Sequence, residues 1–167
     1  MRNIIIGAEA FNSCGKLQNV TIPNSVVKLD DYAFMCCSNL KSLTLPSSVT
    51  AIGAQTFVGC SSLKTAAISK SVTSVGDLAF SNCAPNFTIY GDACSYIHKY
   101  TRKYGIPFVV NGTDINNDSI INIKDLSSIS KAYGAKSGGT SYQAKLDFNN
   151  DKIIDIFDLV VISEALK

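Results

Sequence analysis

The chain has 167 residues, of which 46% are hydrophobic and 17% charged, so its composition is that of a globular protein and not of a disordered one. The net charge is only +2, and lysine and arginine form no basic stripe with interleaved aromatic residues, which argues against nucleic acid as a partner. No apolar run reaches the roughly 18 residues of a membrane span, and the first seven residues are too short in their apolar part for the core of a secretory signal.

A regular repeat organises residues 6 to 91, with units that begin at Ile6, Leu29, Ile52 and Val75. In each unit, phenylalanine occupies one position, cysteine another, and leucine, isoleucine or valine several more. The two marker columns, each with a constant interval, are Phe11, Phe34, Phe57 and Phe80, and Cys14, Cys37, Cys60 and Cys83. One such unit cannot bury its apolar face alone, whereas stacked units join the columns into one core, so the sequence predicts a solenoid. The regular cysteine column indicates a slot for a small buried thiol and not a disulfide framework.

Each unit predicts a short strand followed by a turn. The segments Val20–Pro23 and Leu43–Pro46 alternate apolar and polar residues and end at proline, and such strands should form a parallel sheet from coil to coil. Phenylalanine and cysteine stand three positions apart in Ala10–Cys14, which predicts a tight helical turn on the opposite side of the coil.

The repeat pattern IG-x-x-AF-x-x-C-x-x-L-x-x-(V/L)-T-(I/L)-P-x-SV resembles the BspA-like subclass of bacterial leucine-rich repeats. The resemblance implies a surface or secreted binding module, whose ligand is a protein or a glycan. The first coil has no preceding strand or polar cap, so we expect the chain to be a fragment of a longer exported protein.

A cap follows the repeats. An amphipathic helix is predicted over residues 93–104, then a strand over residues 106–110. The inward face of this helix should carry Ala93, Tyr96, Ile97, Tyr100 and Tyr104. These tyrosines could form a sugar-stacking platform, but their helical spacing favours packing. His98 should lie on the solvated face, without a catalytic partner.

A second pattern occurs twice, first from Asp114 and again from Asp147. In each copy, carboxylate or amide side chains fall at loop positions 1, 3, 5, 9 and 12, and an apolar residue at position 7 offers its backbone carbonyl. This is the ligand order of a twelve-residue Ca²⁺ loop. The predicted ligands of two Ca²⁺ ions are Asp114, Asn116, Asp118, Ile120, Asn122 and Asp125 in the first loop, and Asp147, Asn149, Asp151, Ile153, Asp155 and Asp158 in the second.

The two loops differ from each other and from an EF-hand. The second loop has one carboxylate more, so we expect it to bind its ion more tightly. Position 6 is Ser119 or Lys152 instead of glycine, and the positive φ required there costs about 1–2 kcal/mol, which ion binding must offset. A long helix precedes neither loop, which argues against a helix–loop–helix calcium sensor.

Each loop is followed by one helical pattern, over residues 124–133 and 157–166. The inward residues should be Leu126, Ile129 and Tyr133 in the first helix, and Leu159, Ile162 and Leu166 in the second. The duplicated loop and helix, an F-hand, resembles the type I-like dockerins of cellulosomes over residues 114–166. That resemblance implies that the partner is a cohesin domain of a scaffoldin, recognised late in each loop and on the exposed helix face. The implied contact residues are Ile123, Lys124, Ser130 and Lys131 in the first copy, and Ile156, Phe157, Ser163 and Glu164 in the second. Because these sets differ in charge and bulk, we expect one copy to dominate.

The sequence therefore predicts an α+β chain with a leucine-rich-repeat solenoid of about four coils, a parallel sheet and a helical cap over residues 1–110. A small all-α dockerin follows over residues 111–167. The lead hypothesis is a non-catalytic, extracellular component of a bacterial cellulosome.

Three questions stay open at this level. The chain could instead be the C-terminal part of a cellulosomal glycoside hydrolase or protease whose catalytic domain lies upstream of residue 1, although no catalytic constellation occurs within these residues. A plain calcium buffer or sensor is a weaker alternative. Cys36 and Cys94 lie outside the cysteine column and could be free or paired.

Overall fold

The computed structural model describes residues 3–93, 95–111, 115 and 123–165. The chain divides into two compact units. The first comprises Met1–Gly91 and Ser95–Phe108, and the second comprises Asp92–Cys94 and Val109–Lys167.

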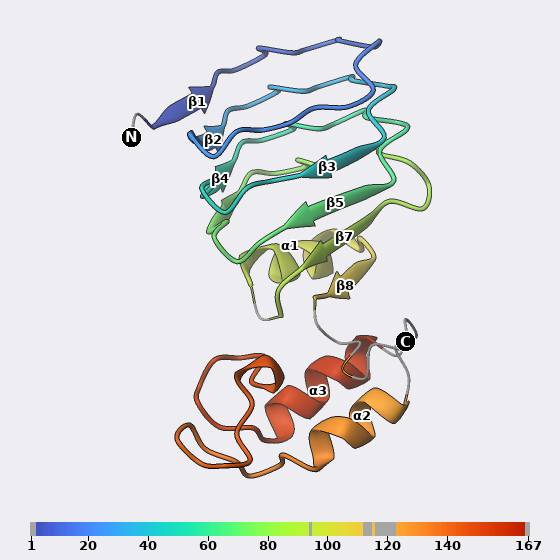
Figure 1. Ribbon diagram of the computed structural model, residues 1–167. Helices are drawn as coiled ribbons and strands as arrows, with labels where there is room; N and C mark the ends of the chain where they lie inside the picture. The colour runs from blue at the N-terminus through green and yellow to red at the C-terminus, as the bar shows by residue number, and fades with distance from the viewer. Residues whose placement is uncertain (1–2, 94, 112–114, 116–122, 166–167) are drawn as a thin grey trace. The chain divides into compact units, whose positions relative to one another are not determined.

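The first unit is a solenoid of stacked coils, as Figure 1 shows, and the predicted solenoid is confirmed. Its strands form two four-stranded sheets. The first sheet has the order β1 (Ile4–Ile6), β2 (Val26–Leu29), β4 (Ala51–Ile52) and β6 (Ser74–Val75). The second has the order β3 (Ser42–Thr44), β5 (Thr65–Ile68), β7 (Thr88–Gly91) and β8 (Phe108–Val110).

Strands of successive coils pair in parallel, one repeat apart, as Ser42 pairs with Thr65 and Thr65 with Thr88. The second sheet is the one predicted from the proline-terminated segments, and the first sheet was not predicted. Residues 20–22 form no strand, although their sequence predicted one.

The turns that close the coils are not helical, so the prediction for Ala10–Cys14 was wrong. Two residues of each turn have left-handed backbone, such as Glu9 (φ 58°) and Ser13 (φ 59°) in the first coil. This conformation costs about 1–2 kcal/mol for a residue with a side chain. It is offset because the turn donates three backbone N–H groups to the next coil, from Glu9 to Asp31 O (3.1 Å), from Phe11 to Ala33 O (2.8 Å) and from Ser13 to Met35 O (2.7 Å). The same three bonds recur between the later coils.

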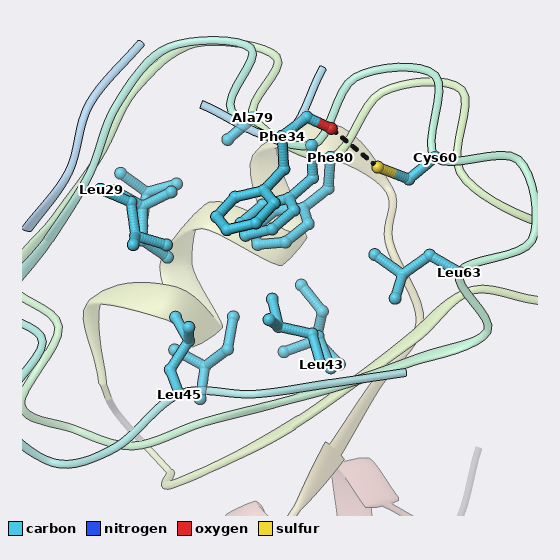
Figure 2. Close-up of a cluster of buried hydrophobic side chains, with 14 of the residues drawn as sticks. Leu29, Phe34, Leu43, Leu45, Cys60, Leu63, Ala79 and Phe80 are labelled. Carbon is cyan, nitrogen blue, oxygen red and sulfur yellow. Dashed lines mark hydrogen bonds between the residues drawn. The ribbon is translucent and has the colours of Figure 1, made fainter. Parts of the chain in front are cut away.

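The core of the solenoid is built on the phenylalanine column (Figure 2). The rings of Phe11 and Phe34, Phe34 and Phe57, and Phe57 and Phe80 are stacked with centroids 4.9, 5.4 and 5.3 Å apart. Phe34 and Phe57 are fully buried, whereas Phe11 at the first coil is 38% exposed. The apolar columns of the repeat therefore do merge into one core, as predicted.

The cysteine column lies beside these rings. The Cys60 thiol donates a hydrogen bond to the Phe34 carbonyl at 3.3 Å, and Cys37 and Cys83 make the equivalent bond one coil before and after. Burial raises the pKa of Cys60 and of Cys83 to about 12, so these thiols stay protonated. The cysteines of the described chain are free thiols, namely Cys14, Cys36, Cys37, Cys60 and Cys83, and Cys94 lies outside it.

The cap begins with α1 (Tyr96–Tyr104), shorter than predicted because Ser95 caps it: its hydroxyl accepts the His98 N–H at 3.3 Å. Gly105 ends the helix in a left-handed conformation (φ 65°), as expected. The predicted inward face is wrong at Tyr96, which is exposed because the helix begins there. His98 is half-buried and stacks on Phe108 at 4.5 Å, so its predicted solvated position is wrong too.

The second unit contains α2 (Ile123–Ser130), a short 3₁₀ helix η1 (Ala144–Leu146) and α3 (Ile156–Ala165). Both long helices begin one residue before the predicted start. Because α2 ends at Ser130, Tyr133 is exposed and does not face inward as expected. The core of this unit consists of Ile129, Ala132, Leu146, Ile154 and Ile162. Within the residues described, the helices are all too short or too polar to cross a bilayer.

The position of a phenylalanine in the phenylalanine column should decide how much that residue stabilises the solenoid. Phe57→Ala removes a fully buried ring stacked on both sides, and we expect a loss of about 3–5 kcal/mol in the free energy of unfolding. Phe11→Ala, the matched control, removes a part-exposed ring stacked on one side and should cost less than half of that. Urea unfolding followed by circular dichroism measures both. Equal losses in the free energy of unfolding would contradict the stacked phenylalanine column as the source of stability.

Candidate functional site

All six predicted ligands of the second loop lie within the described residues. The first and last of them, Asp147 and Asp158, are buried, and both fold the loop by accepting backbone N–H groups. Asp147 Oδ1 accepts from Asp151 (3.1 Å) and Oδ2 from Lys152 (2.9 Å). Asp158 Oδ1 accepts from Phe148 (2.6 Å) and Oδ2 from Asp155 (2.9 Å). The loop is thus wrapped around its own carboxylates.

The backbone at position 6 has the predicted conformation. Lys152 has φ 72°, which is the left-handed region normally reserved for glycine, and Asn150 two positions earlier has φ 61°. Ser119, the equivalent of Lys152 in the first loop, lies outside the described residues. The loop therefore holds two strained residues, and the hydrogen bond from the Lys152 N–H to Asp147 Oδ2 provides part of the compensation at Lys152.

The electrostatics of this loop favour a cation. Burial raises the pKa of Asp158, the nearby charge of Asp147 raises it further, and hydrogen bonds from backbone N–H groups oppose the shift. Neither carboxylate forms an ion pair with a lysine or arginine in the described chain. The side chains at the ligand positions offer oxygen alone, which is the donor set that Ca²⁺ prefers.

Within the described residues, no group of three or more acidic, histidine or cysteine side chains lies close enough together to hold a metal ion. In this conformation the loop carboxylates are directed at backbone N–H groups instead. A bound cation would therefore have to draw the carboxylates together, which couples metal binding to the folding of the loop.

The first loop is described only in part. Five of its predicted ligands lie outside the described residues, namely Asp114, Asn116, Asp118, Ile120 and Asn122. The sixth, Asp125, is fully buried, and its Oδ1 accepts the N–H of Ile115 at 2.8 Å. Asp158 makes the same bond with Phe148 at the equivalent positions of the second copy. In both copies the last ligand position is thus tied to the second residue of the loop.

Sequence reasoning missed one residue of this site. The Tyr142 hydroxyl donates a hydrogen bond to Asp147 Oδ2 at 2.7 Å and so holds the first ligand position of the second loop. Such outer contacts orient a metal ligand. The equivalent residue of the first copy is Val109, which has no hydroxyl. Tyr142 lies in the connector before the loop, where spacing gives no signal.

A groove of about 470 Å³ lies between the two long helices. Its lining is mostly apolar, and each lining residue of α2 has its equivalent at the matching position of α3. The lining consists of Ile123, Leu126, Ser127 and Ser130 from α2, and of Ile156, Leu159, Val160 and Ser163 from α3. Ile123 is 67% exposed and Ile156 is 53% exposed, although both are large and apolar. An exposed apolar groove of this kind is typical of an interaction site.

The predicted partner-binding residues divide into two groups. Ile123, Ser130, Ile156 and Ser163 come together in the groove lining. Lys124, Lys131 and Phe157 are exposed but lie outside the lining, and the side chain of Glu164 is not among those described.

Leu126 and Leu159 pack against the core as predicted, and they also line the groove, which was not predicted. Ser127 and Val160 were not considered as lining residues. Helical spacing of three, four and seven positions from Ile123 and from Ile156 could have found them.

Comparisons with known proteins give two family matches. The family described as the BspA type leucine rich repeat region matches residues 2–104 in six copies. The family described as the dockerin type I domain matches residues 112–167. Among curated proteins, no match is found.

Solved structures similar to this chain include three bacterial proteins. A leucine-rich repeat protein from Bacteroides ovatus ATCC 8483 is 28% identical over 64% of this chain and 28% of that chain, with a TM-score of 0.56. A leucine rich cell surface protein from Faecalibacterium prausnitzii A2-165 is 32% identical over 53% and 25%, with a TM-score of 0.45. The pneumococcal vaccine antigen PcpA is 21% identical over 62% and 32%, with a TM-score of 0.43. The chain thus spans about a third or less of each of these structures.

Tyr142→Phe should weaken the binding of Ca²⁺ to the second loop by roughly tenfold, because Asp147 loses the hydroxyl that orients it. Isothermal titration of the full chain with Ca²⁺ measures the affinity of each site. The control is Tyr133→Phe, which removes the hydroxyl of an exposed tyrosine in the same unit. If both variants bind Ca²⁺ as the parent chain does, Tyr142 does not position the ligand.

Proposed function

Because the chain belongs to the BspA-type leucine-rich repeat family and carries a type I dockerin domain at residues 112–167, we propose that it is a non-catalytic component of a bacterial cellulosome. The dockerin binds a cohesin domain of a scaffoldin in a calcium-dependent manner. The repeat domain presents a surface to a protein or a glycan outside the cell. We assign the repeat domain to residues 1–110 and the dockerin to residues 111–167.

The observation that carries the proposed docking surface is the groove between α2 and α3. It unites the four residues Ile123, Ser130, Ile156 and Ser163, which the resemblance to dockerins had marked from both copies. The exposed apolar side chains of Ile123 and Ile156 lose contact with water when a partner covers them, at about 25 cal/mol per Å² of apolar surface. The hydroxyls of Ser130 and Ser163 donate to Ser127 O and Val160 O within their own helices and can accept hydrogen bonds from the partner.

Calcium acts on this surface through the starts of the helices. We propose two Ca²⁺ ions, one in each loop. Asp125 and Asp158 are the last ligand positions of their loops and also lie in the first turn of α2 and of α3. An ion held by these carboxylates fixes where each helix begins, and with it the positions of Ile123 and Ile156, which start the two helices and line the groove.

Two alternatives come from the sequence. Both matched families are non-catalytic modules, so a catalytic activity would have to belong to a longer protein of which this chain is a part. A plain calcium buffer would bind the ion without a cohesin. The exposed groove favours the docking function over the buffer, because a buffer has no need for an exposed apolar surface.

Removal of calcium is expected to abolish cohesin capture. Without the ions, buried Asp147 and Asp158 repel each other and the helix starts lose their anchor. A pull-down with a panel of type I cohesins, with Ca²⁺ and with EDTA, measures this, and circular dichroism should report lower helix content in EDTA. Capture that persists in EDTA would remove the mechanism, and absence of capture by every cohesin with Ca²⁺ would remove the proposed partner.

Charged residues placed in the groove lining test whether the groove is the docking surface. Ile123→Asp and Ile156→Asp should each weaken cohesin binding at least tenfold, and the double variant should abolish it, because a carboxylate would be buried against apolar surface. Calcium affinity and helix content should stay unchanged. Tyr133→Asp, an exposed position outside the groove lining, is the control. Undiminished binding of the double variant would place the cohesin elsewhere.

A further inference from the structure

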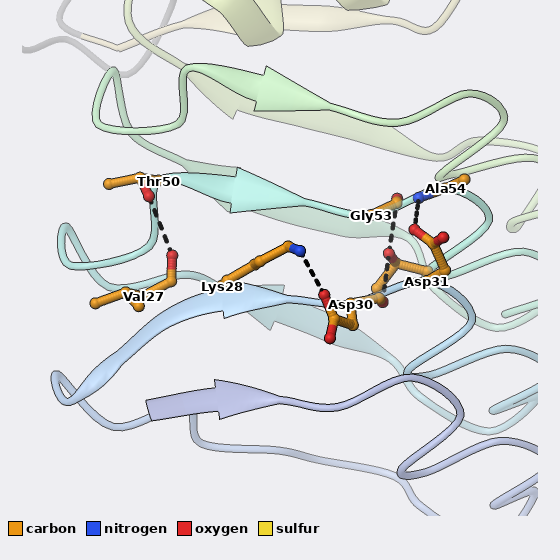
Figure 3. Close-up of polar contacts among 8 residues, drawn as sticks. Val27, Lys28, Asp30, Asp31, Thr50, Gly53 and Ala54 are labelled. Carbon is orange, nitrogen blue, oxygen red and sulfur yellow. Dashed lines mark hydrogen bonds and ion pairs between the residues drawn. The ribbon is translucent and has the colours of Figure 1, made fainter. Parts of the chain in front are cut away.

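Hydroxyl side chains of the solenoid fall into two groups, and the first group is structural. In the segments before β4 and β6, several hydroxyls donate to backbone carbonyls of the preceding coil. Thr50 donates to Val27 O at 3.2 Å (Figure 3), and Thr73 donates to Thr50 O at 3.3 Å. Ser48 bonds Val26 O at 2.7 Å in the same way. These hydroxyls are occupied in joining coils.

The second group lies on the outward face of the second sheet and on residues 19–22 beside it. The hydroxyls of Thr21, Ser42, Thr44 and Thr65 form no side-chain hydrogen bond within the described residues. In β3, Leu43 is buried while Ser42 and Thr44 on either side are exposed, so both hydroxyls stand on the outer surface. They are therefore available to another molecule.

The register of the solenoid sets these side chains in rows. Ser42 pairs with Thr65 in the neighbouring strand, and strands in a sheet are about 4.8 Å apart, so their hydroxyls repeat at that spacing. The row of Thr44 continues through Ala67 to Tyr90, which is 39% exposed. A tyrosine ring thus stands at the end of a row of small side chains.

A hollow of about 310 Å³ lies at the other end of these rows. It is lined by residues 19–22 and by Ser42, Thr44 and Pro46, and no charged residue takes part. Lys41 and Lys64 are exposed just before β3 and β5, but they do not line the hollow.

We propose that this surface, the hydroxyl face, binds a neutral polysaccharide; it is defined by Asn19, Thr21, Ser42, Thr44, Thr65 and Tyr90. The inference rests on the proposed function in that it names the ligand class of the repeat domain. Free hydroxyl and amide groups act as both donors and acceptors, which matches the hydroxyl groups of sugars. An aromatic ring offers its apolar face to a sugar ring.

The same chemistry disfavours the other ligand classes. A protein partner would need an apolar centre with large aromatic or arginine anchors, and the hollow has none in its lining. An anionic polysaccharide would need cationic groups in the site, and the lining is uncharged. Each hydroxyl contributes little on its own, so an extended chain that crosses several rows is the ligand that fits.

The experiment is affinity electrophoresis of the full chain in native gels that contain hydroxyethylcellulose, xylan or galactomannan, with polygalacturonate as the anionic comparison. At least one neutral polysaccharide should retard the chain. The double variant Ser42→Ala/Thr44→Ala should lower the affinity at least tenfold, and Tyr90→Ala should lower it by a similar factor. The matched control is Thr50→Ala/Thr73→Ala, whose hydroxyls bond the neighbouring coil, and its retardation should equal that of the parent chain.

Three results would overturn the proposal: no retardation by any neutral polysaccharide, retardation by polygalacturonate alone, or full retardation of both the double variant and Tyr90→Ala. Circular dichroism of every variant checks that the solenoid is folded. Cohesin capture by the same variants should be unchanged, because the docking groove lies in the other unit. Failure of the hydroxyl face is thereby separated from failure of the proposed docking function.

Discussion

The solenoid depends on backbone hydrogen bonds that join each coil to the next, and the bonds donated by the turns all run forward along the chain. Each turn donates its alternate N–H groups to carbonyls of the next coil, as Phe34 donates to Thr56 O at 2.9 Å. This register stacks the phenylalanine rings, brings each cysteine thiol to a carbonyl and aligns the hydroxyl rows. Beyond the last coil, the cap accepts hydrogen bonds from the backbone. The N–H groups of Phe80 and Ala79 donate to the Tyr100 hydroxyl, and burial raises the pKa of Tyr100 to about 12. The cap helix thus takes the place of the next coil.

The second unit is held together in a different way from the solenoid. Its core is small, and its two loops each place a buried aspartate, Asp125 or Asp158, at the start of a helix, where the carboxylate bonds the backbone of its own loop. In the second loop, Asp147 and Asp158 are not neutralised by a lysine or arginine of the described chain. A cation bound between these two carboxylates would neutralise the repulsion that remains between them. Under the proposed function, loop folding, helix position and groove shape would all depend on that cation.

A feature could be predicted from the sequence where one residue type recurs at a fixed spacing. A feature that depends on backbone strain or on contacts between residues far apart in the sequence could not. The phenylalanine and cysteine columns and both loop patterns follow from the sequence, because one residue type recurs at one position. The left-handed turns gave no signal, since Glu9 and Ser13 are not glycine and the coils override their preference. Strands of two residues, such as Ala51–Ile52, are too short to show alternation. Tyr142 contacts Asp147 from a connector whose fold the local pattern does not specify.

Under the proposed docking function, the groove would allow a duplicated module to bind firmly and still prefer one orientation. Ile123 and Ile156, Leu126 and Leu159, and Ser130 and Ser163 are identical pairs, so exchanging the two helices leaves most of the contact surface unchanged. Three positions break this equivalence, where Ser127 corresponds to Val160, Lys124 to Phe157 and Lys131 to Glu164. Burying one valine or phenylalanine side chain is worth about 1.5–3 kcal/mol, and about 1.4 kcal/mol changes an equilibrium tenfold. Under the proposed docking function, the shared lining would supply affinity in either orientation, and Phe157 with Val160 would favour the one in which the partner presents its more apolar side to the second copy.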